Sequence, residues 1–520
     1  MKVCTAQKVR HCLLTRQEIA LFDLRGEALY ALGHPLFAAS LPLGHMESQI
    51  FEMVPRKDTP IVVYDEGEGL VSIAINRLSA LGYSDVNALQ GGLSGWRAAG
   101  YELFQDVNSA SKAFGELVES QRNTPSIAAP DAKALIEGED NLVVLDARRF
   151  DEYQNMSIPR GVNVPGAELV LRARTMAPDP STTIIVNCAG RTRSIIGTQS
   201  LINAGLPNPI MALRNGTIGW MLAGQKLDKG RDERFPELND KDTEVARDLA
   251  SAVSYRAGVK RIDVDGLVAL EQDSGRTLYR FDVRTLEEYS AGHIPGFRSA
   301  PGGQLVQETD AFAPVRGARI VLSDDIGPRA DMSGSWLAQM GGEVYILEGG
   351  FEFSLDKGPG ASTRPDLPDA EVIDCDKLEQ ELSTVRLVDV SKNPAYRRGH
   401  IKTAVYAKRS QIEDILVASD DRPIVVTSDD GYLAHFAAAE IKALSGRSVF
   451  ALEGGNSAWK ASGRVLERGE GEELVVPDDV YRRPYEGTDN PNSAMQAYLD
   501  WESGLIGQLE KDGTHGFYVI

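Results

Sequence analysis

The sequence predicts an α/β protein built from four tandem domains, each a mostly parallel sheet flanked by helices on both faces. Four segments share one layout, in which an apolar strand ending in an acidic residue precedes a second apolar strand, an amphipathic helix and a turn that leads to an aromatic residue. The strands are almost continuously apolar, as in TTIIVN at 182–187. Such strands are typical of parallel sheets that are buried on both faces.

The spacing within the four segments predicts the number of domains. From the acidic residue of the first strand to the position just after the second strand, the interval is 42 residues in three segments and 39 in the fourth. From that position to a tryptophan, it is 31 or 32 residues in the three segments that have one. Four near-equal repeats predict four domains, over residues 6–105, 122–228, 258–360 and 367–467.

Two further segments lie outside the repeats. Residues 229–257 contain DTEVARDLASAV, which predicts a helical linker between the second and third domains. Residues 468–520 lack the repeated layout, and apolar and aromatic residues on one face predict a helix over 494–510. We expect this C-terminal segment to pack against a domain or to serve as a dimerisation contact, in which case the protein is a homodimer.

Composition limits the class of protein. The 520 residues carry a net charge of −20 and are 42% hydrophobic, which excludes wholesale disorder and disfavours a surface that binds nucleic acid. No apolar run reaches the roughly 18 residues that indicate a membrane span. The first residues do not resemble a signal peptide, and four cysteines are too few for a disulfide framework. We therefore expect a cytoplasmic protein with neither nucleic-acid nor membrane partners.

The position just after the second strand is where chemistry is expected, because ligands bind beyond the carboxyl ends of strands in open α/β sheets. The four repeats place Asp65, Cys188, Asp324 and Ser428 there. Only Cys188 can act as a sulfur nucleophile. We expect the second domain to be catalytic and the first, third and fourth to be silent.

Cys188 begins a six-residue loop before a helix that is predicted to open at Ser194. The small residues let successive amides point inward, and the helix adds its positive end, so the loop resembles an anion cradle. Such a cradle, together with the loop arginines, is expected to lower the pKa of Cys188 and to bind an anionic substrate. A cysteine can instead be a small buried hydrophobe that closes a strand. The loop consists of Cys188, Ala189, Gly190, Arg191, Thr192 and Arg193.

Histidine and metal chemistry are not expected. No histidine lies in the second repeat, so a cysteine–histidine mechanism would lack a local base, and no cluster of cysteine and histidine has metal-ligand spacing. We expect neither a metal nor a cofactor. His34, His293 and His400 occupy one repeat position, which predicts a structural hydrogen bond common to the fold.

The second repeat resembles the rhodanese family of sulfurtransferases, and the resemblance extends over all four repeats as rhodanese-like domains. It is carried by D-A-R at 146–148, S-I-P-R-G at 157–161, the loop C-A-G-R-T-R and N-G-T-I-G-W ending at Trp220. The resemblance implies that Cys188 carries a sulfane sulfur as a persulfide and that the rest of the loop, with Arg148, binds the donor. It also implies that Asp146 supports the loop from the neighbouring strand.

The function implied by the resemblance is transfer of sulfur from an anionic donor such as thiosulfate to a thiophilic acceptor, cyanide in vitro or a thiol in the cell. Two alternatives remain open. Cysteine-dependent phosphatases and arsenate reductases use a similar cradle, although their loops are one residue longer between the cysteine and the arginine than the stretch from Cys188 to Arg193. A non-catalytic scaffold that carries persulfide sulfur on Cys188 is the second alternative.

Overall fold

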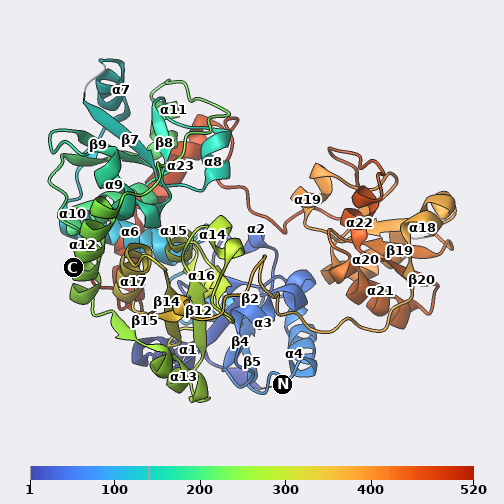
Figure 1. Ribbon diagram of the computed structural model, residues 1–520. Coiled ribbons are helices and arrows are strands. Elements are labelled where there is room, and N and C mark those ends of the chain that lie inside the picture. Colours follow the sequence, from blue (N-terminus) through green and yellow to red (C-terminus); the bar gives the residue numbers. More distant parts are fainter. Residues whose placement is uncertain (1, 139–140, 419) are drawn as a thin grey trace.

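The computed structural model describes residues 2–138, 141–418 and 420–520, and its sheets repeat one topology four times (Figure 1). In each sheet the first strand along the chain pairs with the fifth. The first five strands of every sheet have the same spatial order. All strand pairings within the four sheets are parallel. The predicted class, four α/β units with parallel sheets, is confirmed.

The first module contains the sheet β1-β5-β4-β2-β3. Its strands are β1 (Val3–Cys4), β2 (Ala20–Asp23), β3 (Ala38–Ser40), β4 (Ile61–Tyr64) and β5 (Val86–Leu89). Its helices are α1 (Ala6–Thr15), α2 (Glu27–Tyr30), η1 (Leu43–Ser48), α3 (Ile50–Met53), α4 (Leu70–Ala80) and α5 (Gly92–Ala98). Strand β1 lies just before the predicted range 6–105, since a strand of two residues leaves no pattern in the sequence.

The second module contains the sheet β6-β10-β9-β7-β8. Its strands are β6 (Ser126–Ile127), β7 (Leu142–Asp146), β8 (Gly161–Asn163), β9 (Thr183–Asn187) and β10 (Ile210–Leu213). Its helices are α7 (Ala129–Glu137), α8 (Phe150–Asn155), η2 (Gly166–Glu168), α9 (Leu169–Met176), α10 (Thr192–Asn203) and α11 (Gly216–Leu222). The central strand β9 is apolar and rich in β-branched residues, as a strand covered by helices on both faces requires.

The third module contains the sheet β11-β15-β14-β12-β13. Its strands are β11 (Lys260–Ile262), β12 (Leu278–Asp282), β13 (Arg298–Ser299), β14 (Arg319–Ser323) and β15 (Glu343–Leu347). Its helices are α13 (Val264–Gln272), α14 (Leu286–Ala291), α15 (Gly302–Gln307), α16 (Thr309–Phe312), α17 (Pro328–Gln339) and η3 (Gly350–Glu352).

The fourth module contains the sheet β16-β20-β19-β17-β18-β21. Its strands are β16 (Val372–Ile373), β17 (Arg386–Asp389), β18 (Val405–Tyr406), β19 (Ile424–Thr427), β20 (Val449–Leu452) and β21 (Glu472–Glu473). Its helices are α18 (Cys375–Glu381), α19 (Asn393–Arg398), η4 (Arg409–Gln411), α20 (Ile412–Ala418), α21 (Tyr432–Ser445) and α22 (Gly455–Ala461). Strand β21 extends this sheet beyond the predicted range 367–467.

Among the residues that the structure describes, four helices lie outside the modules and join them. They are α6 (Ser109–Arg122), α12 (Asp240–Arg256), α23 (Asn492–Ser503) and α24 (Leu505–Asp512). Helix α12 lies within the predicted linker and packs against α9 of the second module and α17 of the third. Helix α6 packs against α10, α15 and α24. Helix α23 packs against α6 and against α11 of the second module. The C-terminal segment therefore contacts a module, which was one of the two expectations for it. Dimerisation stays a prediction.

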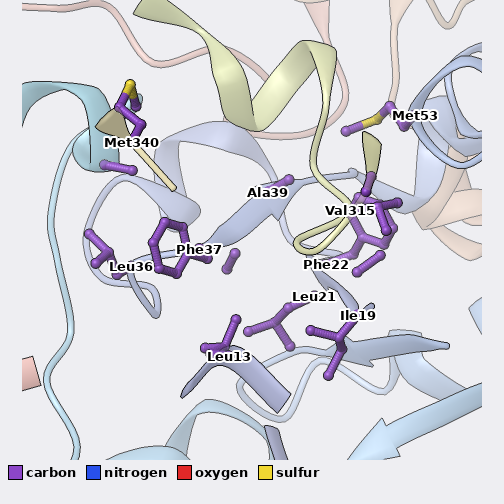
Figure 2. Close-up of a cluster of buried hydrophobic side chains, with 14 of the residues drawn as sticks. Leu13, Ile19, Leu21, Phe22, Leu36, Phe37, Ala39, Met53, Val315 and Met340 are labelled. Carbon is purple, nitrogen blue, oxygen red and sulfur yellow. The ribbon is translucent and has the colours of Figure 1, made fainter. Parts of the chain in front are cut away.

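The first and third modules share one hydrophobic core. Phe22 from β2 and Val315, which precedes β14, belong to the same buried cluster, as Figure 2 shows. Backbone hydrogen bonds between Ile19 and Arg316 and a 2.6 Å bond from the Tyr279 hydroxyl to the Met53 carbonyl join the modules across this core. The two modules therefore form one continuous packing unit.

The fourth module is attached differently. Its two apolar clusters are made of residues from its own part of the chain, and it forms a separate lobe, orange in Figure 1. Its contact with the first module includes ion pairs: Arg409, almost fully buried, pairs with Glu47, and Arg77 pairs with Glu440 at 2.8 Å. A charged interface of this kind suits modules that fold around their own cores.

The repeated histidines have the structural role that the sequence predicts. The imidazole rings of His34, His293 and His400 stack on the tyrosine four residues earlier, with ring centroids 3.9, 3.8 and 4.1 Å apart. Their Nδ1 atoms lie within hydrogen-bond distance of backbone carbonyls. In the second module, Ser157 takes this position and forms the equivalent backbone bridge with Asp228.

Within the described residues, none of the helices has both the length and the apolar character that crossing a membrane would need. That finding agrees with the absence of a long apolar run in the sequence.

Two adjacent leucines of α1 give a matched test of the shared core. Leu13 is 8% exposed and belongs to the cluster, whereas Leu14 is 57% exposed. Leu13→Ala is expected to reduce the free energy of unfolding by about 2–5 kcal/mol, because it leaves a cavity. Leu14→Ala should change it by less than about 0.5 kcal/mol. Denaturation midpoints followed by circular dichroism measure both, and equal midpoints for the two variants would contradict this packing.

Candidate active site

Cys188 lies directly after β9, at the carboxyl end of a central strand of the second sheet. Strand β9 is flanked by β7 and β10, and α10 follows the loop. The helix begins at Thr192, two residues before the Ser194 expected from the sequence. The Ser194 hydroxyl donates a 2.8 Å hydrogen bond to the Arg191 carbonyl, which draws the end of the loop into the first turn. The predicted site residues Thr192 and Arg193 therefore belong to the helix.

The sulfur of Cys188 is buried, and this corrects the expected pKa. The residue is 1% exposed, and its Sγ lies 3.4 Å from the Ser194 hydroxyl oxygen. Burial raises the pKa of the Cys188 thiol, because a thiolate is disfavoured away from water; Arg193, Ser194 and Arg148 act in the opposite direction without cancelling it. The predicted lowering of this pKa is wrong for the closed site that the structure shows.

The two loop arginines are engaged by carboxylates. Arg193 forms two hydrogen bonds with Glu152, at 2.7 and 2.8 Å. Burial would raise the pKa of Glu152, but Arg193, with help from Arg148 and Arg149, outweighs burial and brings that pKa to about 2. Arg191 binds Glu116 at 2.6 and 2.8 Å, and also pairs with Glu119. The positive charge expected at the loop is therefore largely neutralised by acidic side chains that sequence reasoning had not included in the site.

Asp146 and Arg148 form a buried pair at the end of the neighbouring strand β7. The Arg148 guanidinium donates to both carboxylate oxygens of Asp146, at 2.9 and 2.7 Å, and to the Met156 carbonyl at 2.6 Å. Asn187, the residue before Cys188, donates to Asp146 at 2.9 Å. One guanidinium nitrogen, Nη1 of Arg148, is buried without a hydrogen-bond partner among the described residues. The pair thus connects β7 to the strand that carries Cys188.

Helix α11 fixes the backbone of the loop from the other side. Amides at its start donate to the carbonyls of Cys188, at 2.9 Å, and Ala189, at 3.1 Å. Gly216 has φ +52°, and a Cβ there would lie 2.3 Å from the Cys188 carbonyl oxygen, so only glycine fits this approach. Gly190, between these residues and the arginines, lies against α23. The predicted residues Ala189 and Gly190 are therefore held between two helices.

The structure brings Arg193 and Arg148 near the sulfur, whereas the Arg191 side chain binds carboxylates of α6, and it also adds partners. The additional residues are Glu116 and Glu119 on α6, Glu152 on α8, and Tyr485 and Tyr498 of the C-terminal segment. Nothing in their local sequence marks them, since a glutamate on an amphipathic helix is ordinarily a solvated residue. The amphipathic character of residues 494–510 was the one feature of the sequence that indicated a contact by this segment. It did not show that the contact is with the Cys188 loop.

Comparisons with known proteins agree with this geometry. A family model described as the rhodanese-like domain matches residues 7–99, 128–223, 267–353 and 374–462. The chain belongs to the rhodanese-like domain family. Its fold is similar to the crystal structure of a thiosulfate sulfurtransferase from Pseudomonas aeruginosa, with 55% identity, a TM-score of 0.98 and coverage of 100% of both chains.

Two curated relatives are similar over shorter stretches. A thiosulfate sulfurtransferase of Azotobacter vinelandii is 28% identical over 202 residues, which are 35% of this chain and 73% of that protein. The thiosulfate sulfurtransferase GlpE of Pseudomonas fluorescens is 31% identical over 77 residues, which are 15% of this chain and 71% of that protein. Both stretches are shorter than the four rhodanese-like domains together.

The other rhodanese-like domains have their own side chains in the loop. In the first, Asp65 accepts hydrogen bonds from the amides of Gly67, at 3.2 Å, and Leu70, at 2.7 Å. In the third, Asp324 accepts from the amide of Arg329 at 2.9 Å and pairs with its guanidinium at 2.8 Å. These carboxylates occupy the amides that would otherwise bind an external anion.

The fourth rhodanese-like domain differs from both. Its Ser428 hydroxyl accepts a 3.3 Å hydrogen bond from the amide of Ala434. The same position thus holds a thiol once, a carboxylate twice and a hydroxyl once. No group of three or more metal-ligating side chains with suitable geometry was found in the part of the chain that the structure describes.

Glu152→Gln tests whether the Arg193 ion pair controls the thiol. Loss of the carboxylate leaves the Arg193 charge unopposed, so the pKa of Cys188 is expected to fall by about one unit. The pH dependence of Cys188 alkylation by iodoacetamide, followed on its peptide by mass spectrometry, measures this shift. Asp151→Asn is the matched control, since Asp151 is exposed and pairs with Arg149 instead. An unchanged titration in Glu152→Gln would show that this carboxylate has no electrostatic effect on the thiol.

Proposed function

We propose that the protein is a sulfurtransferase that moves a sulfane sulfur through a persulfide on Cys188. The observation that carries the proposal is the position of a cysteine at the carboxyl end of β9, next to the first turn of α10 and the Arg193 guanidinium. Full-length likeness to a thiosulfate sulfurtransferase supports the same reaction class. The donor is a small anion such as thiosulfate.

The reaction has two steps, and atoms and electrons balance in each. The Cys188 thiolate attacks the outer sulfur of thiosulfate, a sulfur–sulfur bond forms to Cys188, and sulfite leaves with the electron pair of the broken bond. The acceptor then attacks the outer sulfur of the persulfide, and the Cys188 thiolate leaves with its electron pair. Cyanide becomes thiocyanate in this step, and a thiol becomes a persulfide. Covalent catalysis thereby divides one exchange into two displacements.

Each predicted residue has a part in this proposal. The amides of the loop from Ala189 to Arg193 and the positive end of α10 stabilise the anionic donor and the departing sulfite. Arg193 and Arg148 favour the thiolate, since both lower the pKa of Cys188 against the effect of burial. Asp146 orients Arg148 and, through Asn187, the end of β9.

The remaining modules are proposed to be silent. Asp65 and Asp324 place a negative charge where an anionic donor would have to bind, and neither can form a persulfide. Ser428 has a hydroxyl, which is a poor nucleophile toward sulfur. We further propose a cytoplasmic location, because all four cysteines are free thiols and a reducing compartment maintains that state.

Thiosulfate:cyanide transfer by Cys188→Ser tests the proposal. Loss of the nucleophile should lower turnover at least about a thousandfold. Cys375→Ser is the control, since Cys375 lies at the start of α18 in the fourth module, and its turnover should match that of the unmodified protein. Substantial turnover in Cys188→Ser would refute the role of Cys188 and would indicate that another module is active. Hydrolysis of an aryl phosphate without sulfur transfer would support the phosphatase alternative.

A further inference from the structure

A segment outside the four modules covers the Cys188 loop. Residues 485–503, here called the C-terminal cover, include Tyr485 and all of α23. In Figure 1, α23 is drawn in red among the helices of the second module, and it contacts α11. One apolar cluster contains side chains of the loop, of α11 and of the cover, all buried. Its buried members are Ala189, Ile218, Tyr485, Met495, Tyr498 and Leu499.

The cover contacts the loop two residues from the sulfur. A Cβ built on Gly190 would lie 3.2 Å from the Tyr498 ring and 3.7 Å from Oε2 of Glu502. The Tyr498 hydroxyl donates a 2.7 Å hydrogen bond to Oε1 of Glu502. Because Cys188 is 1% exposed, a donor or acceptor cannot reach its sulfur until the surroundings of the loop move.

Glu502 is an unusual residue to find at such a contact. It is 0% exposed, and its Oε2 has no hydrogen-bond partner among the described residues. Lys112 and Glu116 of α6 and Arg191 of the loop are the charged groups that face it, and Tyr498 is the titratable group on its own helix. Burial raises the pKa of Glu502 to about 8, with Glu116 acting in the same direction and the two cations against it. The side chain is therefore mainly a neutral acid at pH 7.

We propose that Tyr498 and Glu502 are specificity-determining residues of the Cys188 reaction. These two residues hold the C-terminal cover over the loop, so that a small thiophilic acceptor reaches the persulfide and the thiol of a folded protein does not. This inference rests on the proposed sulfurtransferase function and names its acceptor class. A small acceptor needs only a local movement of side chains around the loop, with α23 left in place. A folded protein needs α23 displaced, which exposes Met495 and Leu499 to water.

The unloading of a preformed persulfide tests this selectivity. The full-length protein is treated with thiosulfate, the donor is removed, and loss of the added sulfur from the Cys188 peptide is followed by mass spectrometry. The acceptors are dithiothreitol and reduced thioredoxin, which are dithiols of very different size. In Tyr498→Ala, unloading by thioredoxin should be at least about tenfold faster than in the unmodified protein, and unloading by dithiothreitol should change less than about threefold.

Gln496→Ala is the matched control for this experiment, because Gln496 is an exposed residue of the same helix. Both rates in Gln496→Ala should equal those of the unmodified protein. The proposed selectivity would be refuted if the unmodified protein transferred sulfur to thioredoxin as fast as to dithiothreitol. It would also be refuted if Tyr498→Ala left the ratio of the two rates unchanged. Failure to form any persulfide on Cys188 would instead overturn the proposed function together with this inference.

Glu502→Gln gives a second test that does not require disruption of the cover. The closed cover holds Glu502 with a pKa of about 8, against 4.5 for a solvated glutamate, so closure retains a proton that opening releases. Closure is therefore strongest below about pH 4.5 and weakens, by at most about tenfold per pH unit, as the pH rises to about 8. Glutamine keeps the acceptor for the Tyr498 hydroxyl and has no proton to lose.

The measurement is alkylation of the Cys188 thiol by a polyethylene-glycol maleimide. Division of the rate for the unmodified protein by the rate for Glu502→Gln cancels the ionisation of the thiol itself. That quotient should rise between pH 5 and pH 8 by at least about tenfold and then level off. A quotient that does not vary with pH would refute the role of Glu502 in closure.

Discussion

The ion pair between Arg193 and Glu152 determines the electrostatics of the Cys188 site. Arg193 lies in the first turn of α10, and its charge is a main influence that favours a thiolate on the buried sulfur. Glu152 on α8 binds both terminal nitrogens of this guanidinium and so reduces that influence. Burial remains the largest influence on the pKa of this thiol and raises it, and the nearby groups offset burial only in part. Reactivity therefore depends on how the surroundings of the loop open.

The four modules show one backbone geometry with different side chains at its centre. The amides after the second strand are satisfied by Asp65 in the first module and by Asp324 in the third, so those loops contain an internal anion. In the second module the thiol of Cys188 is too weak an acceptor for this purpose. In the first and third modules, a fixed carboxylate thus takes the position of the thiol and stabilises the loop from within.

The second module is completed by elements that are not part of its repeat. Helix α6 supplies Glu116 and Glu119 to Arg191, and α23 covers Ala189 and Gly190. These helices connect the loop to the first and third modules, since α6 also packs against α15 and α24. An isolated second module would lack both the carboxylates that neutralise Arg191 and the apolar cover over the loop.

The sequence alone determined the four repeats, the parallel sheets and the position of Cys188, because strand periodicity and fixed intervals are local properties of a chain. The family resemblance also pointed to Asp146 and Arg148 at one strand end, but not to the ion pair that they form with each other. The lowered pKa expected for Cys188 was wrong, because that expectation counted charges near in sequence and omitted burial. Glu116, Glu152 and Glu502 come from three separate helices, and only the tertiary structure decided that they meet at one loop. Their effect depends on distance and solvent exclusion, which a linear pattern does not contain.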